Sequence, residues 1–197
     1  MMSKSGSHPL ILASSSPRRR YLLEKAGLMF SVIPSTLDES SVPVGPIENH
    51  VRMLAEAKAM EVAEVYPKSW VIAADTLVLI GDAVLGKPDT EAQARQMLKA
   101  LSGKTHRVLT GYCICCNTAE RSFSETVETK VTFKTLSDTE IDWYLNTDEP
   151  FDKAGAYAVQ GLGSFLVKRI EGSYTNVVGL PVCEVMEYLL REGVVKR

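Results

Sequence analysis

The chain has little of what marks secreted, membrane-spanning or nucleic-acid-binding proteins. Its 197 residues include only four cysteines, and its net charge of −2 offers no basic excess for a nucleic-acid backbone. No apolar run reaches the roughly 20 residues that cross a bilayer, and residues 1–8 lack the apolar segment of a signal peptide. We therefore expect no nucleic-acid and no membrane partner, a short disordered leader over residues 1–8, and one domain over residues 9–197.

The few cysteines favour a cytoplasmic protein with reduced thiols over a secreted one. Cys113, Cys115 and Cys116 fall in a single apolar run, GYCICCN. A zinc site usually needs further paired cysteines or nearby histidines, and the nearest histidine is His106. We interpret the three cysteines as small buried core residues, with a metal site as the weaker alternative.

Apolar periodicity and turn residues predict strands and helices that alternate over the first hundred residues. This order is typical of an α/β architecture, and we predict a mixed, twisted sheet flanked by helices. Residues 125–134 alternate apolar and polar side chains, so part of the sheet should be antiparallel or at an edge. The expected strands span residues 9–13, 29–33, 70–80, 83–86, 105–116, 125–134 and 162–170, the expected helices span 17–26, 47–66, 90–101, 137–145 and 182–191, and residues 172–181 are expected to form a loop.

Asp75 is the one acid in a nearly continuous apolar strand, WVIAADTLVLI. An ionised carboxylate there costs several kcal/mol unless it is paired, bound to a metal or placed at a cleft. A salt bridge to a nearby lysine or arginine and a catalytic or metal-binding role explain it about equally well.

The segment SSSPRRR, at residues 14–20, forms the start of a predicted helix. Ser16 can cap this helix and Pro17 can occupy its first position. Cations at residues 18–20 oppose the helix dipole, but an anion bound at the same end would reverse the sign. We favour phosphate binding over a solvated basic turn, although the P-loop and dinucleotide fingerprints are absent.

Several charged side chains stand near strand–helix junctions or on an inward helix stripe. Lys58 lies on such a stripe, where it can either snorkel to solvent or reach into a site. Cations with one or two carboxylates suit a polyphosphate and a divalent ion, with a carboxylate to activate water. The cations are Arg18, Arg19, Lys58 and Lys87, and the acids are Glu39 and Asp75.

Taken in order along nearly the whole chain, a set of motifs resembles the Maf family of nucleoside triphosphate pyrophosphatases. Each motif alone is weak, whereas the ordered set is highly specific. The motifs are SSSPRRR, LDE at 37–39, AEAKA at 55–59, AADT at 73–76, GKP at 86–88, SGKTHRVLTG at 102–111, DKAGAYAVQG at 152–161 and GSYTNVVGLP at 172–181. The resemblance implies a Maf/ITPase-like fold with two lobes around a central cleft.

The resemblance also implies an activity. It implies hydrolysis between the α and β phosphates of a nucleoside triphosphate, a divalent cation (Mg²⁺ or Mn²⁺), and house-cleaning of nucleotide pools. Asp75 resembles the family's proton acceptor, and Glu39 resembles a second acid that handles metal or water, so both are also expected metal ligands. The expected phosphate and substrate contacts are Ser14, Arg18, Arg19, Lys58, Lys87 and Lys153.

Three residues resemble the branch that accepts dTTP and UTP, and by extension modified pyrimidine nucleotides. They are Arg18 after Pro17, Thr76 after Asp75, and Gln160. The branch that prefers methylated guanine nucleotides carries Trp and Gln at the first two positions. Relatives often form dimers, so a homodimer is also implied. A non-enzymatic nucleotide-binding regulator of cell division, using the same pocket, is the alternative function, and the missing P-loop counts against a kinase.

Overall fold

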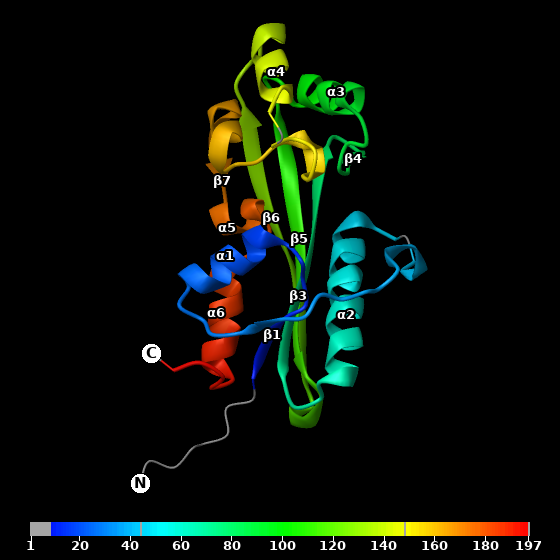
Figure 1. Ribbon diagram of the computed structural model, residues 1–197, viewed down its shortest axis with the longest axis vertical. Coiled ribbons are helices and arrows are strands. Elements are labelled where there is room, and N and C mark those ends of the chain that lie inside the picture. The colour runs from blue at the N-terminus through cyan, green and yellow to red at the C-terminus, as the bar shows by residue number, and fades with distance from the viewer. Residues whose placement is uncertain (1–8, 44, 148, 197) are drawn as a thin grey trace. The chain divides into compact units, whose positions relative to one another are not determined.

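A computed structural model describes residues 9–196 except 44 and 148. The predicted leader, residues 1–8, lies outside the described residues. Over the first hundred residues helices alternate with strands, as predicted, except that the hairpin strands β3 and β4 follow one another (Figure 1). The helices are α1 (Pro17–Lys25), α2 (Ile47–Val65), α3 (Glu91–Leu101), α4 (Asp138–Leu145), α5 (Tyr174–Val178) and α6 (Val182–Arg191), and the strands are β1 (Leu10–Leu12), β2 (Ser31–Val32), β3 (Trp70–Ile80), β4 (Ala83–Leu85), β5 (Thr105–Cys116), β6 (Arg121–Phe133) and β7 (Val167–Glu171).

The strands form one mixed sheet in the order β2-β1-β3-β5-β6-β7, with β4 paired to β3. β1 pairs in parallel with β2 and β3, whereas β3–β4 and β6–β7 are antiparallel. The prediction of a mixed sheet with flanking helices is therefore confirmed. The chain divides into two compact units: unit 1 holds residues 1–75, 111–126 and 179–197, and unit 2 holds 76–110 and 127–178. The predicted cleft and the single domain over 9–197 stay predictions.

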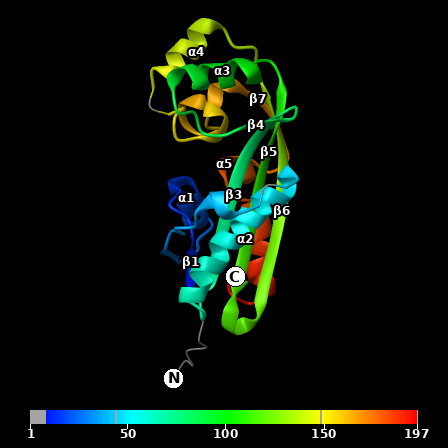
Figure 2. The same cartoon turned by 90° about the vertical axis from the view of Figure 1, so that its right-hand side faces the viewer.

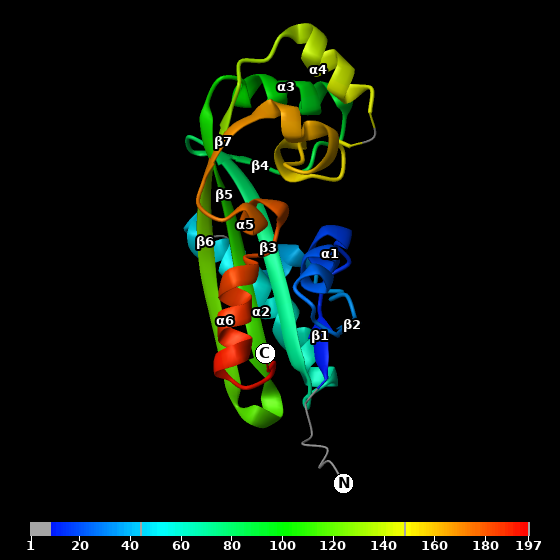
Figure 3. The same cartoon turned by 90° about the vertical axis from the view of Figure 1, so that its left-hand side faces the viewer.

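Unit 1 is a sheet covered on both faces. α2 packs on one face (Figure 2) and α6 on the other (Figure 3). Side chains of Val71 and Ala73 point toward α2 and share a buried cluster with Cys113 and Cys115, whereas Trp70 contacts Tyr188 of α6 edge to face. The cysteines are free, and the three in β5 are buried, which confirms their prediction as core residues.

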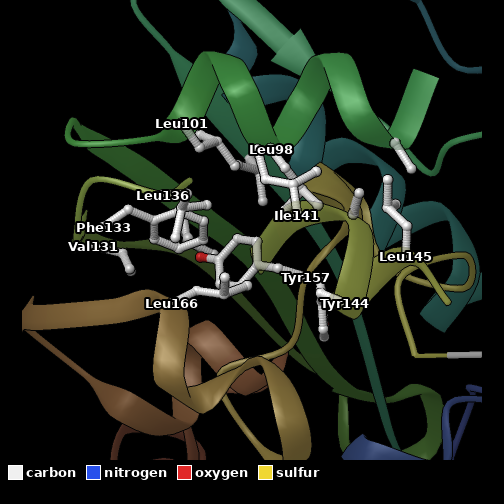
Figure 4. Packing of buried hydrophobic residues seen from close by; sticks show 14 residues of the cluster. Leu98, Leu101, Val131, Phe133, Leu136, Ile141, Tyr144, Leu145, Tyr157 and Leu166 are labelled. Carbon is white, nitrogen blue, oxygen red and sulfur yellow. The ribbon is translucent and has the colours of Figure 1, made fainter. Parts of the chain in front are cut away.

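Unit 2 is built around a second buried cluster (Figure 4). Leu98 and Leu101 of α3 face Ile141 and Tyr144 of α4, and aromatic rings from β6 and the following loops complete it. The amphipathic pattern of α3 and α4 explains this packing, because their apolar positions recur at helical spacing. Ser137 and Glu140 form a complete capping box at the start of α4.

Several boundaries differ from the sequence prediction: β2 spans only Ser31–Val32, and β6 begins at Arg121 instead of residue 125. The strand expected at 162–170 begins only at Val167, because Gly161–Leu166 forms a 3-10 helix. The loop expected at 172–181 contains helix α5, so that prediction was wrong. The side chain of Ser173 accepts a hydrogen bond from the Asn176 amide (3.2 Å) and so caps this helix. One helical turn is too short to produce a readable hydrophobic period.

Candidate functional site

The parallel strands β1 and β2 end at the same edge of the sheet in unit 1, beside the middle of β3, which continues to Ile80. Leu12 pairs with Val32 of β2 and with Ile72 of β3. Ser14 therefore emerges beside the segment that leads to Glu39, and Asp75 lies just beyond Ile72. In open α/β sheets, ligands bind at this end of parallel strands.

Helix α1 begins at this same edge. The Ser16 side chain caps it by accepting from the Arg19 amide (3.4 Å), and Pro17 occupies the first position, as predicted. Ser14 is buried, and its hydroxyl oxygen accepts from the Ser16 amide (3.2 Å) and from an Arg19 guanidinium nitrogen (3.2 Å). Arg19 also donates through Nε to the Gly179 carbonyl (2.8 Å), which fixes the guanidinium at the start of the helix.

Lys58 joins the two predicted acids. Its Nζ lies 2.8 Å from Asp75 Oδ1 and 2.7 Å from Glu39 Oε1. Because side chains alternate between the two faces of a strand, Asp75 lies on the same face of β3 as Val71 and Ala73. This is the face that α2 covers. The inward position of Lys58 on α2 therefore meets Asp75 directly. Lys58 and Asp75 are 13% and 14% exposed, so this ion pair is largely shielded from water, whereas Glu39 is 60% exposed.

Arg19 shares the electrostatic environment of this cluster. Burial lowers the pKa of Arg19 from its ordinary value, Asp75 and Glu39 act to raise it, and Arg18 acts to lower it. Lys58 and Arg19 thus interact with both carboxylates, and Arg18 lies close enough to Arg19 to repel it. A bound anion at the start of α1 would relieve the repulsion between the arginines and add the favourable interaction with the helix dipole.

The adjacent acids at 38 and 39 have different roles. Asp38 caps the 3-10 turn Glu39–Ser41, because its carboxylate accepts from the Ser40 hydroxyl (2.7 Å) and from the Ser40 backbone N–H (3.0 Å). These two hydrogen bonds lower the pKa of Asp38. Glu39 instead points to Lys58. The structure therefore separates the structural acid, Asp38, from the acid in the cluster, Glu39.

Glu61 was not predicted, although it holds the segment that leads to Glu39. Its carboxylate accepts from the Thr36 amide (3.0 Å), the Thr36 hydroxyl (2.6 Å) and the Ser35 hydroxyl. The hydrogen bonds from Ser35 and Thr36 lower the pKa of Glu61. The only sequence signal was its position on α2, one turn beyond Lys58.

Four of the predicted site residues belong to unit 2. Lys87 is exposed. Lys153 is only 13% exposed, and its Nζ donates to the Glu149 carbonyl (2.6 Å) and pairs with Asp152. Two motifs meet here as well, because the amide of Gly155 donates to the carbonyl of Gly86 (3.0 Å), which ties GKP to DKAGAYAVQG.

Thr76 and Gln160, the other two, are partly exposed. The hydroxyl of Thr76 lies 3.0 Å from that of Thr110, and the Thr110 hydroxyl donates to the Asn176 carbonyl (3.2 Å). Asn176 is fully buried and donates through Nδ2 to Val108 and to the Thr129 hydroxyl. The sequence assigned no role to Asn176. The structure shows that Asn176 connects Thr110, Val108 and Thr129 by hydrogen bonds.

Glu39 and Asp75 are suited to a divalent cation. Magnesium is usually held by one or two carboxylates together with substrate phosphate oxygens, and two carboxylates that meet one ammonium supply that protein share. Within the described residues, no group of three or more His, Cys, Asp or Glu side chains forms a complete cation site. The two-carboxylate set therefore fits a cation that binds with its nucleotide.

The chain is similar to members of one protein family along almost its whole length. The family model described as "Maf-like protein" matches residues 9–192. The chain belongs to the Maf family. A relative from Halalkalibacterium halodurans named "dTTP/UTP pyrophosphatase" is 49% identical over 94% of this chain and 96% of that relative. Relatives of the same name from Geobacillus sp. and Syntrophus aciditrophicus are 50% and 47% identical, over 93% of this chain in each case and over 98% and 90% of the relative.

Membership of the Maf family confirms the resemblance read from the motifs. A solved structure of a HAM1 protein from Coxiella burnetii is 17% identical, with a TM-score of 0.50 over 93% of this chain and 98% of that one. At this identity, the similarity shows a shared fold and nothing about function. In the described part of the Maf chain, we find no helix that is both long and apolar enough to cross a membrane.

Proposed function

We propose that this Maf-family chain is a nucleoside triphosphate pyrophosphatase that hydrolyses dTTP and UTP. The products are the nucleoside monophosphate and pyrophosphate. The observation that carries the proposal is the cluster at the strand ends of unit 1, where Lys58 joins Asp75 and Glu39 beside the arginine start of α1. The names of the relatives, at 47–50% identity, supply the substrate class.

Asp75 is the proton acceptor in this proposal. A water oxygen forms a new bond to the α-phosphorus. The α–β phosphoanhydride bond breaks, and pyrophosphate leaves with the electron pair of that bond. The proton released by the water passes to the Asp75 carboxylate. The ion pair with Lys58 (2.8 Å) holds that carboxylate in place, and fixed geometry of the base is what general base catalysis requires.

The basic residues neutralise the phosphates. We assign phosphate contacts to the amides at the start of α1 and to the cations, because charge-assisted hydrogen bonds to phosphate are strong and oriented. Ser14 and Arg19, already hydrogen-bonded to each other, hold the helix start in a fixed geometry. The full substrate-binding set is Ser14, Arg18, Arg19, Lys58, Lys87 and Lys153.

A divalent cation, Mg²⁺ or Mn²⁺, completes the proposed site. When bound, it would neutralise phosphate charge and lower the barrier to attack by water. Glu39 and Asp75 are the residues that would hold it. Lys58 occupies one oxygen of each carboxylate, so it fixes the spacing of the two acids before nucleotide arrives.

We assign base discrimination to Arg18, Thr76 and Gln160. The hydroxyl of Thr76 is oriented by Thr110, whose own hydroxyl is anchored on the buried Asn176 backbone. Hydroxyl and amide groups fixed in this way discriminate strongly between bases, because a wrong base leaves them unpaired.

In the cell, we propose that the enzyme works in the cytoplasm as a homodimer and removes surplus or modified pyrimidine nucleotides. The free thiols in the described residues fit a reducing compartment. Light scattering coupled to size-exclusion chromatography tests the dimer: a mass of one 21.6 kDa chain at micromolar concentration would contradict it.

The test of the function is a nucleotide panel. The purified chain is incubated with Mg²⁺ and dTTP, UTP, dCTP or dGTP, and pyrophosphate and orthophosphate are resolved. We expect equal amounts of dTMP and pyrophosphate from dTTP, the analogous products from UTP, and much slower turnover of the other two. Nucleotide-dependent thermal stabilisation without any product would contradict the proposal and support a non-enzymatic regulator.

A further inference from the structure

Glu149 is the residue that fixes the backbone directly after Gln160. Its Oε1 accepts from the Gly163 amide (2.7 Å) and from the Tyr144 hydroxyl (2.9 Å), and its Oε2 accepts from the Leu162 amide (2.9 Å). Both carboxylate oxygens are therefore used to hold one loop. Sequence reasoning assigned no role to this acid.

The loop before Gln160 is held by the same cluster. The Tyr144 hydroxyl oxygen accepts from the Ala158 amide (3.2 Å) while its proton goes to Glu149. The chain is thus pinned on both sides of Gln160, at Ala158 on one side and at 162–163 on the other. Tyr144 is fully buried, so this anchor belongs to the core of unit 2.

Two glycines allow the loop to wrap closely around the carboxylate. Gly161 has a φ of +69°, and a Cβ there would lie 2.5 Å from Glu149 Oε2. A Cβ at Gly163 would lie 2.6 Å from the Tyr144 hydroxyl and 3.0 Å from Glu149 Oε1. The backbone conformation and the acid are therefore matched, since only glycine fits at this distance.

Glu149 also holds Lys153, through its backbone. The Lys153 ammonium donates to the Glu149 carbonyl (2.6 Å). The Glu149 side chain thus holds the backbone next to Gln160, whereas its main-chain carbonyl holds Lys153. The Leu162 and Gly163 amides lie at the start of the 3-10 helix Gly161–Leu166, so the Glu149 carboxylate holds the first turn of that helix, which is not part of the sheet.

We propose that Glu149 is a positioning residue for base discrimination, acting through the conformation of the Gln160 loop. The inference rests on the proposed function. Only a carboxylate can serve here, because it accepts from three donors at once. A glutamine has one carbonyl oxygen, and its NH₂ group would face a backbone N–H.

The test compares Glu149→Gln with Glu140→Gln, by steady-state kinetics with dTTP and dCTP. Glu140 is a matched control, because it is also a glutamate in unit 2 with several hydrogen bonds, at the α4 cap, and no contact with residues 158–163 is shown for it. For Glu149→Gln we expect KM for dTTP to rise and the dTTP/dCTP ratio of kcat/KM to fall about tenfold, since lost hydrogen bonds each cost about that factor. For Glu140→Gln we expect an unchanged ratio.

Tyr144→Phe supplies a second variant that removes one hydroxyl and keeps the ring in the core. It should lower the dTTP/dCTP ratio in the same direction and by less. A wild-type ratio in Tyr144→Phe and in folded Glu149→Gln, with only the melting temperature lowered, would overturn the inference and leave the proposed function intact. A wild-type chain that releases no pyrophosphate from dTTP would overturn the proposed function, and this inference with it.

Discussion

Lys58 compensates the burial of Asp75, and the two carboxylates it binds differ in what they contribute to stability. Asp75 is 14% exposed and Glu39 is 60% exposed. Ion pairs in water contribute little, whereas removing one partner from a shielded pair leaves the other charge desolvated. The energetic weight of the cluster therefore lies on the Lys58–Asp75 contact.

Replacing Lys58 should be costly for this reason. We expect Lys58→Met to lower the free energy of unfolding by about 1–3 kcal/mol, since Asp75 loses its ammonium partner. Glu39→Gln, which alters the exposed arm of the same cluster, should change it by less than about 1 kcal/mol. Urea denaturation of the two variants measures both free energies of unfolding. An equal decrease in the two variants would contradict the larger contribution of the shielded Lys58–Asp75 pair.

His106 gives the fold a dependence on pH. It is buried, its Nε2 shares a hydrogen bond with the Tyr157 hydroxyl (2.8 Å), and its Nδ1 has no hydrogen-bond partner among the described residues. Burial lowers the pKa of His106 from 6.5 to about 4. The neutral form is therefore the one that the folded chain accommodates.

The sign of the pH effect follows from this shift. The unfolded chain takes up a proton near pH 6.5 and the folded chain only near pH 4, so stability should fall as pH is lowered through that window, by up to roughly 3 kcal/mol. His106→Gln should flatten the part of the curve between about pH 6.5 and 5. Denaturation at a series of pH values checks this, and the same slope in both proteins would contradict it.

Among the elements of unit 1, β5 and α2 approach each other closely. Gly111 of β5 lies against the backbone of Val51 and Arg52, and a Cβ built there would overlap both. Backbone atoms of a packed helix cannot yield as a side chain can. This glycine therefore fixes how closely α2, and with it Lys58, approaches the sheet.

A methyl group at this position should separate the helix from the strand. We expect Gly111→Ala to lower the free energy of unfolding by roughly 3 kcal/mol through overpacking and to reduce turnover by displacing Lys58. Gly45→Ala is the control, because a Cβ there meets nothing within 4 Å. Thermal denaturation of both variants tests this prediction. Equal melting temperatures for Gly111→Ala and Gly45→Ala would contradict the close contact between β5 and α2.

The elements were largely predictable because their signals are local. Three local signals mark where a helix begins or a hairpin turns: the Ser16 cap with Pro17, the Ser137–Glu140 capping box and the turn at 81–82. α5 was missed because its one cap, Ser173, precedes a single turn. The early start of β6 at Arg121 was missed because its first residues are polar and mostly exposed.

The site was predictable only in part, for a tertiary reason. Lys58 and Asp75 carry a signal in the sequence, since each breaks an apolar pattern. Glu61 and Glu149 do not, because an acid in a helix or a loop is ordinary until the donors around it are known. Resemblance to the family's motifs points to the residues that we propose to bind substrate, and it does not point to the acids that hold the neighbouring backbone segments.

At the scale of the whole molecule, the fold, the family and the charge cluster support the same proposed activity. The proposed cation adds a further expectation: a chelator such as EDTA should abolish pyrophosphate release from dTTP, and added Mg²⁺ or Mn²⁺ should restore it. Melting the chelated protein without nucleotide should give an unchanged transition, because the two carboxylates are already paired with Lys58. Full turnover in EDTA would contradict the cation's role.

Asp75→Asn tests the central claim most directly. Pyrophosphate and dTMP released from dTTP with Mg²⁺ are measured for the wild type and the variant, with the melting temperature recorded for each. The account predicts equimolar dTMP and pyrophosphate from the wild type, and a fall in kcat of about a hundredfold or more in a variant that remains folded. Wild-type turnover by Asp75→Asn, or orthophosphate as the wild-type product, would contradict it.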